Sequence, residues 1–184
     1  MKIHIETKRL IMRDLIEQDT QGMFELDSEP EVHTYLGNNP IKTLNEAENN
    51  IVFIKEQYEK NGIGRWAVIE KKTGDFIGWS GFKLITDVVN NRTQYYDLGY
   101  RFIKKYWGKG YATETAIASL DFGFNQLNQK EICAIADIEN LASNKILQKI
   151  GMSKVNKFDY ENLSHNFYIM KKNEWNKSRI ANNL

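Results

Sequence analysis

The sequence has only one cysteine, Cys133, among 184 residues. A disulfide within the chain needs two cysteines and a cysteine-based zinc site needs several, so both are excluded. Proline is also scarce, with two residues, whereas hydrophobic residues make up 41% and charged residues 27% of the chain. This composition is that of a globular protein rather than a disordered or fibrous one. Its length predicts one domain over residues 1–184, with a full-sized core.

Long apolar runs and an excess of one charge are absent as well. No run approaches the ~20 residues of a membrane-spanning helix, and the opening MKIHIETKRL has charges instead of an apolar signal core. We therefore expect a cytoplasmic protein with no membrane partner. Lys and Arg number 25 against 24 Asp and Glu. Because nucleic-acid binders usually have a marked basic excess, we expect no nucleic-acid partner.

Apolar periodicity and turn signals predict a mixed α+β fold. Residues 4–13 are expected to form an opening strand and residues 17–27 a helix. Ser28 with Glu31, and Thr43 with Glu46, have the capping-box spacing that starts a helix. Three runs rich in β-branched and aromatic residues follow, with connections too short for a crossover helix, and they predict consecutive antiparallel strands at 65–70, 76–85 and 95–103.

The second half of the chain predicts two further helices and three further strands. The helices are expected at 112–127 and 142–150, the latter ended by Gly151. A strand is expected at 131–138 and a terminal strand pair within 153–171. Residues 172–184 are expected to be a partly disordered tail.

The segment most indicative of chemistry is WGKGYATE, residues 107–114, between a predicted strand and a predicted helix. Its glycines let the backbone approach a ligand closely. The amides and the dipole of a helix's first turn attract an anion, and Lys104, Lys105 and Lys109 are nearby in sequence. We predict a phosphate-bearing ligand here; the alternative is a turn that merely needs glycine. The segment lacks the third glycine of a dinucleotide fingerprint and the spacing of a P-loop.

Two segments together, LGYRFIKKYWGKGYATE and ENLASNKILQKIGM, resemble the GNAT superfamily of acetyl-CoA-dependent N-acetyltransferases. The sequence is most similar to the branch of ribosomal-protein N-terminal acetyltransferases. Gly110 and Ala112 match the end of the family's Gln/Arg-x-x-Gly-x-Gly/Ala loop, whereas Trp107 stands where Gln or Arg is usual. The resemblance implies an α+β GNAT fold: a mostly antiparallel mixed sheet of about seven strands, about four helices, and a phosphate-binding loop after the fourth strand.

The resemblance also implies a binding site for acetyl-CoA as acetyl donor, without a metal. Backbone groups of Phe102 and Ile103 would pair with the pantetheine arm, and Asn140 and Asn144 would contact the same arm. The pyrophosphate would be held by backbone amides of Gly108, Lys109, Gly110, Tyr111, Ala112 and Thr113.

Two residues are candidates for proton transfer. Asp97 matches the strand position where many relatives have a catalytic glutamate, and it could accept the proton of the attacking amine directly or through water; its alternative is an ion pair within the sheet. Ser143 matches a hydroxyl near the thioester sulfur and could protonate the leaving thiolate. Its alternative is a helix N-cap. Cys133 lies in an apolar strand and is expected to be a buried small hydrophobe.

The implied reaction is acetyl transfer to a primary amine by direct attack in a ternary complex. A protein N-terminal α-amine is favoured, with a polyamine or aminoglycoside as the alternative acceptor and a non-catalytic acyl-CoA-binding module as the alternative function. Residues 1–100 have a net charge of −4 and residues 101–184 one of +5, and seven acids but no Lys or Arg fall from Asp14 to Glu31. Since the early helices flank the acceptor site in this family, we hypothesise a cationic acceptor. Family members often dimerise, which leaves a homodimer open.

Overall fold

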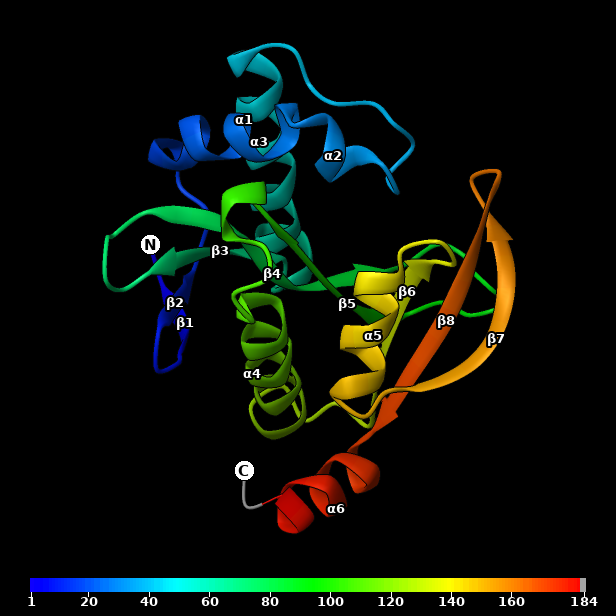
Figure 1. Ribbon diagram of the computed structural model, residues 1–184. Helices are drawn as coiled ribbons and strands as arrows, with labels where there is room; N and C mark the ends of the chain where they lie inside the picture. The colour runs from blue at the N-terminus through cyan, green and yellow to red at the C-terminus, as the bar shows by residue number, and fades with distance from the viewer. Residues whose placement is uncertain (183–184) are drawn as a thin grey trace. The chain divides into compact units, whose positions relative to one another are not determined.

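The computed structural model describes the backbone of residues 1–182 and the side chains of residues 1–177 (Figure 1). Eight strands form a mixed sheet in the order β1-β2-β3-β4-β5-β6-β8-β7. The strands are β1 (Ile3–Glu6), β2 (Leu10–Arg13), β3 (Arg65–Glu70), β4 (Phe76–Ile85), β5 (Tyr95–Phe102), β6 (Glu131–Asp137), β7 (Ser153–Tyr160) and β8 (Leu163–Lys171). The pairing of β5 with β6 is parallel.

Six α-helices lie within the described residues, and none is long and apolar enough to cross a membrane. They are α1 (Thr20–Ser28), α2 (Pro30–His33), α3 (Leu44–Asn61), α4 (Tyr111–Asn125), α5 (Leu141–Lys149) and α6 (Lys172–Asn182). The α+β class and the consecutive strands β3, β4 and β5 confirm the sequence-based expectation.

The described residues form eight strands and six α-helices, where about seven and about four were expected. Residues 4–13 were expected to be one strand, but the chain turns back at Thr7–Arg9, so β1 pairs antiparallel with β2. The hydroxyl of Thr7 accepts a hydrogen bond from Leu10 N at 3.0 Å, which closes this turn. The expected phosphate loop therefore follows the fifth strand instead of the fourth.

The tail expected at 172–184 is helical over its described part. Residues 172–182 form α6, and Trp175 is buried with its ring centroid 6.1 Å from that of Phe124. The apolar contact of Trp175 gives this segment a packed face, which explains why it is ordered. Residues 183 and 184 lie outside the described residues.

The chain forms two compact units. The first comprises residues 1–83 and 99–119, and the second comprises residues 84–98 and the chain from 120 onward. In the first unit, α1 packs against α3 (Figure 1), and the core includes Leu10, Met12, Met23, Leu26 and Trp66. In the second unit, β6 pairs with β8 over its whole length, and the core includes Cys133, Phe167, Tyr168 and Leu147.

Candidate active site

The predicted phosphate loop forms a glycine turn that leads directly into α4. Gly108 and Gly110 have φ angles of 73° and 80°, a left-handed conformation that favours glycine. A Cβ atom added at Gly108 would meet nothing within 4 Å, so the outer side of the turn is open. The first helical hydrogen bond runs from Glu114 N to Gly110 O at 3.0 Å. The amides between these two residues therefore have no partner inside the helix, and an anion fits against them.

The backbone at the end of β5 is partly engaged within the protein. Ile103 N donates to Ile77 O at 3.0 Å, and Ile103 O accepts from Tyr106 N at 2.9 Å. The indole of Trp107 donates to Phe102 O at 2.7 Å. Each carbonyl oxygen keeps a second lone pair for a ligand. The indole of Trp107 thus holds the strand end that precedes the loop.

The three lysines near the loop differ in their contacts. Lys104 pairs with Glu31, and Lys105 pairs with Glu25 at 2.7 Å. The ammonium of Lys109 lies 4.8 Å from the centre of the Tyr106 ring. Lys109 is itself part of the glycine turn. Of the three lysines, Lys109 is therefore the one whose charge is best placed to attract a phosphate to the glycine turn.

The acidic stretch from Asp14 to Glu31 is largely paired with bases of the same unit. Four of its seven acids form ion pairs with Lys or Arg: Asp19 with Arg13, Glu25 with Lys105, Asp27 with Arg101 and Glu31 with Lys104. Asp14 is hydrogen-bonded to His4 at 2.6 Å. Much of the charge on which the hypothesis of a cationic acceptor depends is thus neutralised within the first unit.

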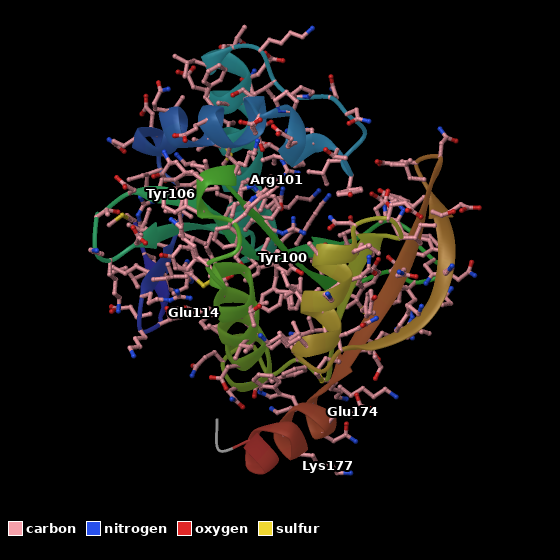
Figure 2. The ribbon with its side chains drawn as sticks, in the orientation of Figure 1. Tyr100, Arg101, Tyr106, Glu114, Glu174 and Lys177 are labelled. Carbon is pink, nitrogen blue, oxygen red and sulfur yellow. The ribbon has the colours of Figure 1, made fainter. Side chains whose placement is uncertain are left out.

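A buried polar cluster around Asp27 was not identified from the sequence. Asp27 is 3% exposed, and one of its oxygens lies 2.6 Å from Arg101 Nη1. Arg101 is labelled in Figure 2. The other oxygen accepts from Asn50 Nδ2 at 3.0 Å, and His33 Nε2 lies 3.8 Å from the carboxylate. Burial, and then the charge of Arg101, lower the pKa of His33. Asp27 and Arg101 are 74 positions apart in the sequence. No local sequence pattern predicts a contact between residues so far apart.

In the second unit, Asp97 is half-buried on β5 and lies opposite Cys133 in the parallel pairing with β6. Cys133 is fully buried, as expected, and burial raises its pKa to about 12. A thiol with such a pKa remains protonated at neutral pH and is a poor nucleophile.

The predicted cofactor contacts on α5 have structural roles. Asn140 is the N-cap of this helix, since its Oδ1 accepts from Ser143 N at 3.0 Å. The alternative of Ser143 as the N-cap is therefore wrong: Ser143 lies inside the helix, where its amide is the capped one. Asn144 Nδ2 donates to Asp137 O and Asn140 O.

The carbonyl side of Asn144 is equally occupied. Its Oδ1 accepts from Asn166 Nδ2 and from the hydroxyl of Tyr168, both at 2.7 Å. A primary amide has two donor hydrogens and two acceptor lone pairs, so the side chain of Asn144 uses its full hydrogen-bonding capacity within the second unit.

Comparison with known proteins identifies the family. Residues 9–153 match the acetyltransferase (GNAT) domain. The chain belongs to the GNAT family. The uncharacterised N-acetyltransferase YoaA of Bacillus subtilis is 32% identical over 151 residues, which cover 82% of each chain. This GNAT protein is thus an acyltransferase whose family transfers acetyl groups to amines.

Solved structures show the same fold. A GNAT-family acetyltransferase from Bacillus anthracis is 26% identical, with a TM-score of 0.75 over 92% of this chain and 98% of its own. The ribosomal-protein-S5-alanine acetyltransferase from Vibrio fischeri is 18% identical, with a TM-score of 0.74 over 95% of this chain and 99% of its own. The GNAT fold implied by the sequence motifs is confirmed.

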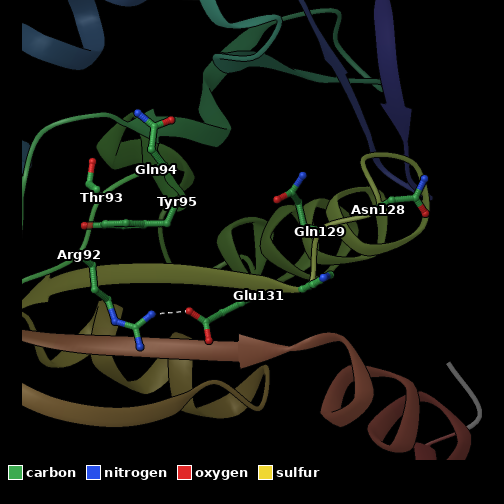
Figure 3. Close-up of a pocket in the computed structure, with 8 residues that line it drawn as sticks. Arg92, Thr93, Gln94, Tyr95, Asn128, Gln129 and Glu131 are labelled. Atoms are coloured by element: carbon green, nitrogen blue, oxygen red, sulfur yellow. Dashed lines mark hydrogen bonds and ion pairs between the residues drawn. The ribbon is translucent and has the colours of Figure 1, made fainter.

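The GNAT protein also has a cavity of about 480 Å³ in its second unit (Figure 3). Its lining is polar and contains none of the predicted site residues. Arg92 and Glu131 form an ion pair at its edge. Among the described residues, no group of three or more His, Cys, Asp or Glu side chains is arranged to hold a metal ion.

Proposed function

We propose that this GNAT enzyme moves an acetyl group from acetyl-CoA to a primary amine, with a protein N-terminal α-amine as the favoured acceptor. The open left-handed turn at Gly108 and Gly110, followed by the amides of the first turn of α4, is the observation that carries this proposal. We further propose that residues 1–184 work as one N-acetyltransferase domain.

The proposed donor site uses mainly backbone groups. The amides from Gly108 to Thr113 hold the pyrophosphate, with the helix dipole adding to the attraction. The carbonyl oxygens of Phe102 and Ile103 pair with the pantetheine arm through their second lone pairs. Asn140 and Asn144 contact the same arm only by sharing groups that already hold α5 in place.

The proposed chemistry requires the nitrogen to lose two protons and the sulfur to gain one. A protonated amine cannot attack a thioester, so Asp97 accepts the first proton from the amine, directly or through water, and later releases it to solvent. The amine nitrogen then attacks the thioester carbonyl, the C–N bond forms, and the C–S bond breaks. Ser143 donates a proton to the departing thiolate, and its hydroxyl is restored by the second proton, which the nitrogen loses as the amide forms. Holding donor and acceptor together supplies much of the rate enhancement.

An acceptor screen tests the proposed function. Acetyl-CoA is held constant, and the release of CoA thiol is followed with peptides, polyamines and aminoglycosides as acceptors. Turnover restricted to peptides with a free N-terminus supports the α-amine, and acetylated N-termini are the matched control peptides. Turnover restricted to polyamines or aminoglycosides overturns the choice of acceptor. Tight binding of acetyl-CoA without turnover on any amine overturns the enzymatic proposal in favour of a CoA-binding module.

A further inference from the structure

The turn between β1 and β2 contacts the phosphate loop although about 100 residues separate them in sequence. Arg9 Nη1 donates to Lys109 O at 2.9 Å, inside the loop. Arg9 Nε donates to Glu114 Oε2 at 2.6 Å. Glu114 lies in the first turn of α4 and is labelled in Figure 2. One guanidinium thus joins the backbone before Gly110 to a side chain after it.

Both carboxylate oxygens of Glu114 accept hydrogen bonds from the turn between β1 and β2. Its Oε1 accepts from the hydroxyl of Thr7 at 2.5 Å and from Arg9 N at 3.2 Å. Burial raises the pKa of Glu114, but the hydrogen bonds from Thr7 and Arg9 outweigh this effect, so the pKa falls below its ordinary value. Glu114 is therefore ionised at neutral pH and forms charge-assisted hydrogen bonds with the turn.

The guanidinium also packs against the loop. Its central carbon lies 4.4 Å from the centre of the Tyr111 ring, and the Tyr111 hydroxyl is hydrogen-bonded to Glu70. A Cβ atom at Gly110 would lie 3.6 Å from Arg9 Nη2. Arg9 therefore contacts Lys109, Tyr111 and Glu114 and lies close to Gly110.

We propose that Arg9 is a positioning residue that fixes the conformation of the Lys109–Glu114 segment and so directs its amides toward the cofactor's pyrophosphate. This inference rests on the proposed function, because it assumes that the loop binds pyrophosphate. Arg9 acts through the loop backbone and through Glu114. We call the contacts of Arg9 with Lys109, Tyr111 and Glu114 the Arg9 clamp.

The chemistry of the clamp is specific to arginine. A guanidinium is planar, donates in several fixed directions and stacks on an aromatic ring. A lysine ammonium on a flexible stem cannot form both hydrogen bonds and the ring contact in this geometry. Arg9→Lys therefore keeps the positive charge and removes the clamp, which separates positioning from simple electrostatic attraction.

The test compares two thioesters in the wild type and in Arg9→Lys. Acetyl-CoA has the pyrophosphate, whereas S-acetylpantetheine has the same acyl arm without it. We expect the KM for acetyl-CoA to rise about tenfold, with kcat and the KM for S-acetylpantetheine within about twofold of the wild type. Arg92→Lys is the matched control, because Arg92 also pairs with a glutamate and its side chain is 42% exposed, as is that of Arg9. The Arg92 variant should leave both KM values unchanged.

Calorimetric binding of acetyl-CoA without acceptor repeats the measurement independently of turnover. An Arg9→Lys variant with wild-type affinity for acetyl-CoA would overturn the inference, as would equal losses on both thioesters, which indicate a general structural defect. If the wild type itself handles both thioesters alike, the proposed pyrophosphate loop fails instead. The two failures are therefore distinguishable.

Discussion

Gly110 combines a backbone constraint with proximity to the proposed ligand. Its φ of 80° strains any residue with a Cβ, whereas the space around it is limited only by Arg9 Nη2. A test of the phosphate site must therefore separate backbone strain from charge.

The pair Gly110→Glu and Gly110→Gln makes this separation. Both variants introduce the same strain and similar bulk, but only glutamate places a negative charge near the phosphates. We expect Gly110→Glu to bind acetyl-CoA at least about tenfold more weakly than Gly110→Gln, as measured by calorimetry. Equal affinities of the two variants would argue against a phosphate at this turn.

Asp97 is the residue whose proposed role depends most directly on pH. If it accepts the amine proton, Asp97→Asn should lower kcat, and the loss should shrink at high pH, where more of the amine is already deprotonated. We expect a loss of about tenfold or more at pH 7 that narrows by pH 9. The measurement is the pH profile of kcat in both proteins, and parallel profiles would assign Asp97 to the structure of β5.

Some residue roles could be predicted from the sequence and others could not. The glycine turn and the burial of Cys133 were predicted, because they depend on local backbone needs and on apolar neighbours. The hydrogen bonds by which Asn144 attaches α5 to β8 could not be predicted, because its partners Asn166 and Tyr168 lie more than 20 positions away in the sequence. Resemblance to a family suggests ligand contacts, but it does not show which groups the protein itself already uses.

Among the elements, α5 depends on Asn144 for its attachment. The side chain joins the helix to the end of β6 through Asp137 O and to β8 through Asn166 and Tyr168. Because Asn144 is 7% exposed, water can hardly replace a lost partner.

Asn144→Asp should therefore destabilise the protein. The new carboxylate would face two backbone carbonyls without a hydrogen to donate, at a cost of about 3 kcal/mol. Urea unfolding measures the change in the free energy of unfolding. Asn156→Asp is the control, since Asn156 is exposed and its side chain is hydrogen-bonded to that of the half-buried Asn90; we expect a change below about 0.5 kcal/mol there. Equal effects in the two variants would contradict the role assigned to Asn144.

Helix starts show how far local signals predict the elements. Thr43 and Glu46 form the expected capping box, and the helix ends at Asn61 with Gly62 in a left-handed conformation, also as expected. Ser28 was expected to start a helix but instead ends α1, and Glu29 is the N-cap of α2 without a side-chain cap bond. Only Glu29 separates α1 from α2, so the residues that end the first helix are also those that start the second, and the capping pattern alone cannot place the boundary.

At the scale of the whole molecule, the uneven charge along the sequence has a structural explanation. Acids of α1 and α2 form ion pairs with Arg101, Lys104 and Lys105. The net charges of the two halves are opposite partly because the halves supply the two sides of these ion pairs. The uneven charge could be counted from the sequence. Which acid pairs with which base could not, because the paired residues are more than 70 positions apart.

The buried histidine of this cluster gives a prediction about stability. Burial and Arg101 lower the pKa of His33 below its ordinary 6.5, so the unfolded chain binds a proton more readily than the folded protein does. The folded state therefore loses stability as the pH falls below about 6.5. His33→Asn cannot titrate, so the stability advantage of the wild type over this variant should shrink between pH 8 and pH 5.5. Urea unfolding over that range measures it, and a constant difference would contradict the prediction.

The Arg9 clamp has a practical consequence for anyone who shortens this protein. Similarity to the family begins at residue 9, so a domain boundary chosen by homology would retain Arg9 and discard Thr7. The truncated chain would lack the Thr7 hydroxyl that donates to Glu114. Arg9 would then lie at the start of the chain, without β1 to pair with β2. Expression boundaries for this enzyme are therefore better set by the hairpin of β1 and β2 than by the extent of sequence similarity.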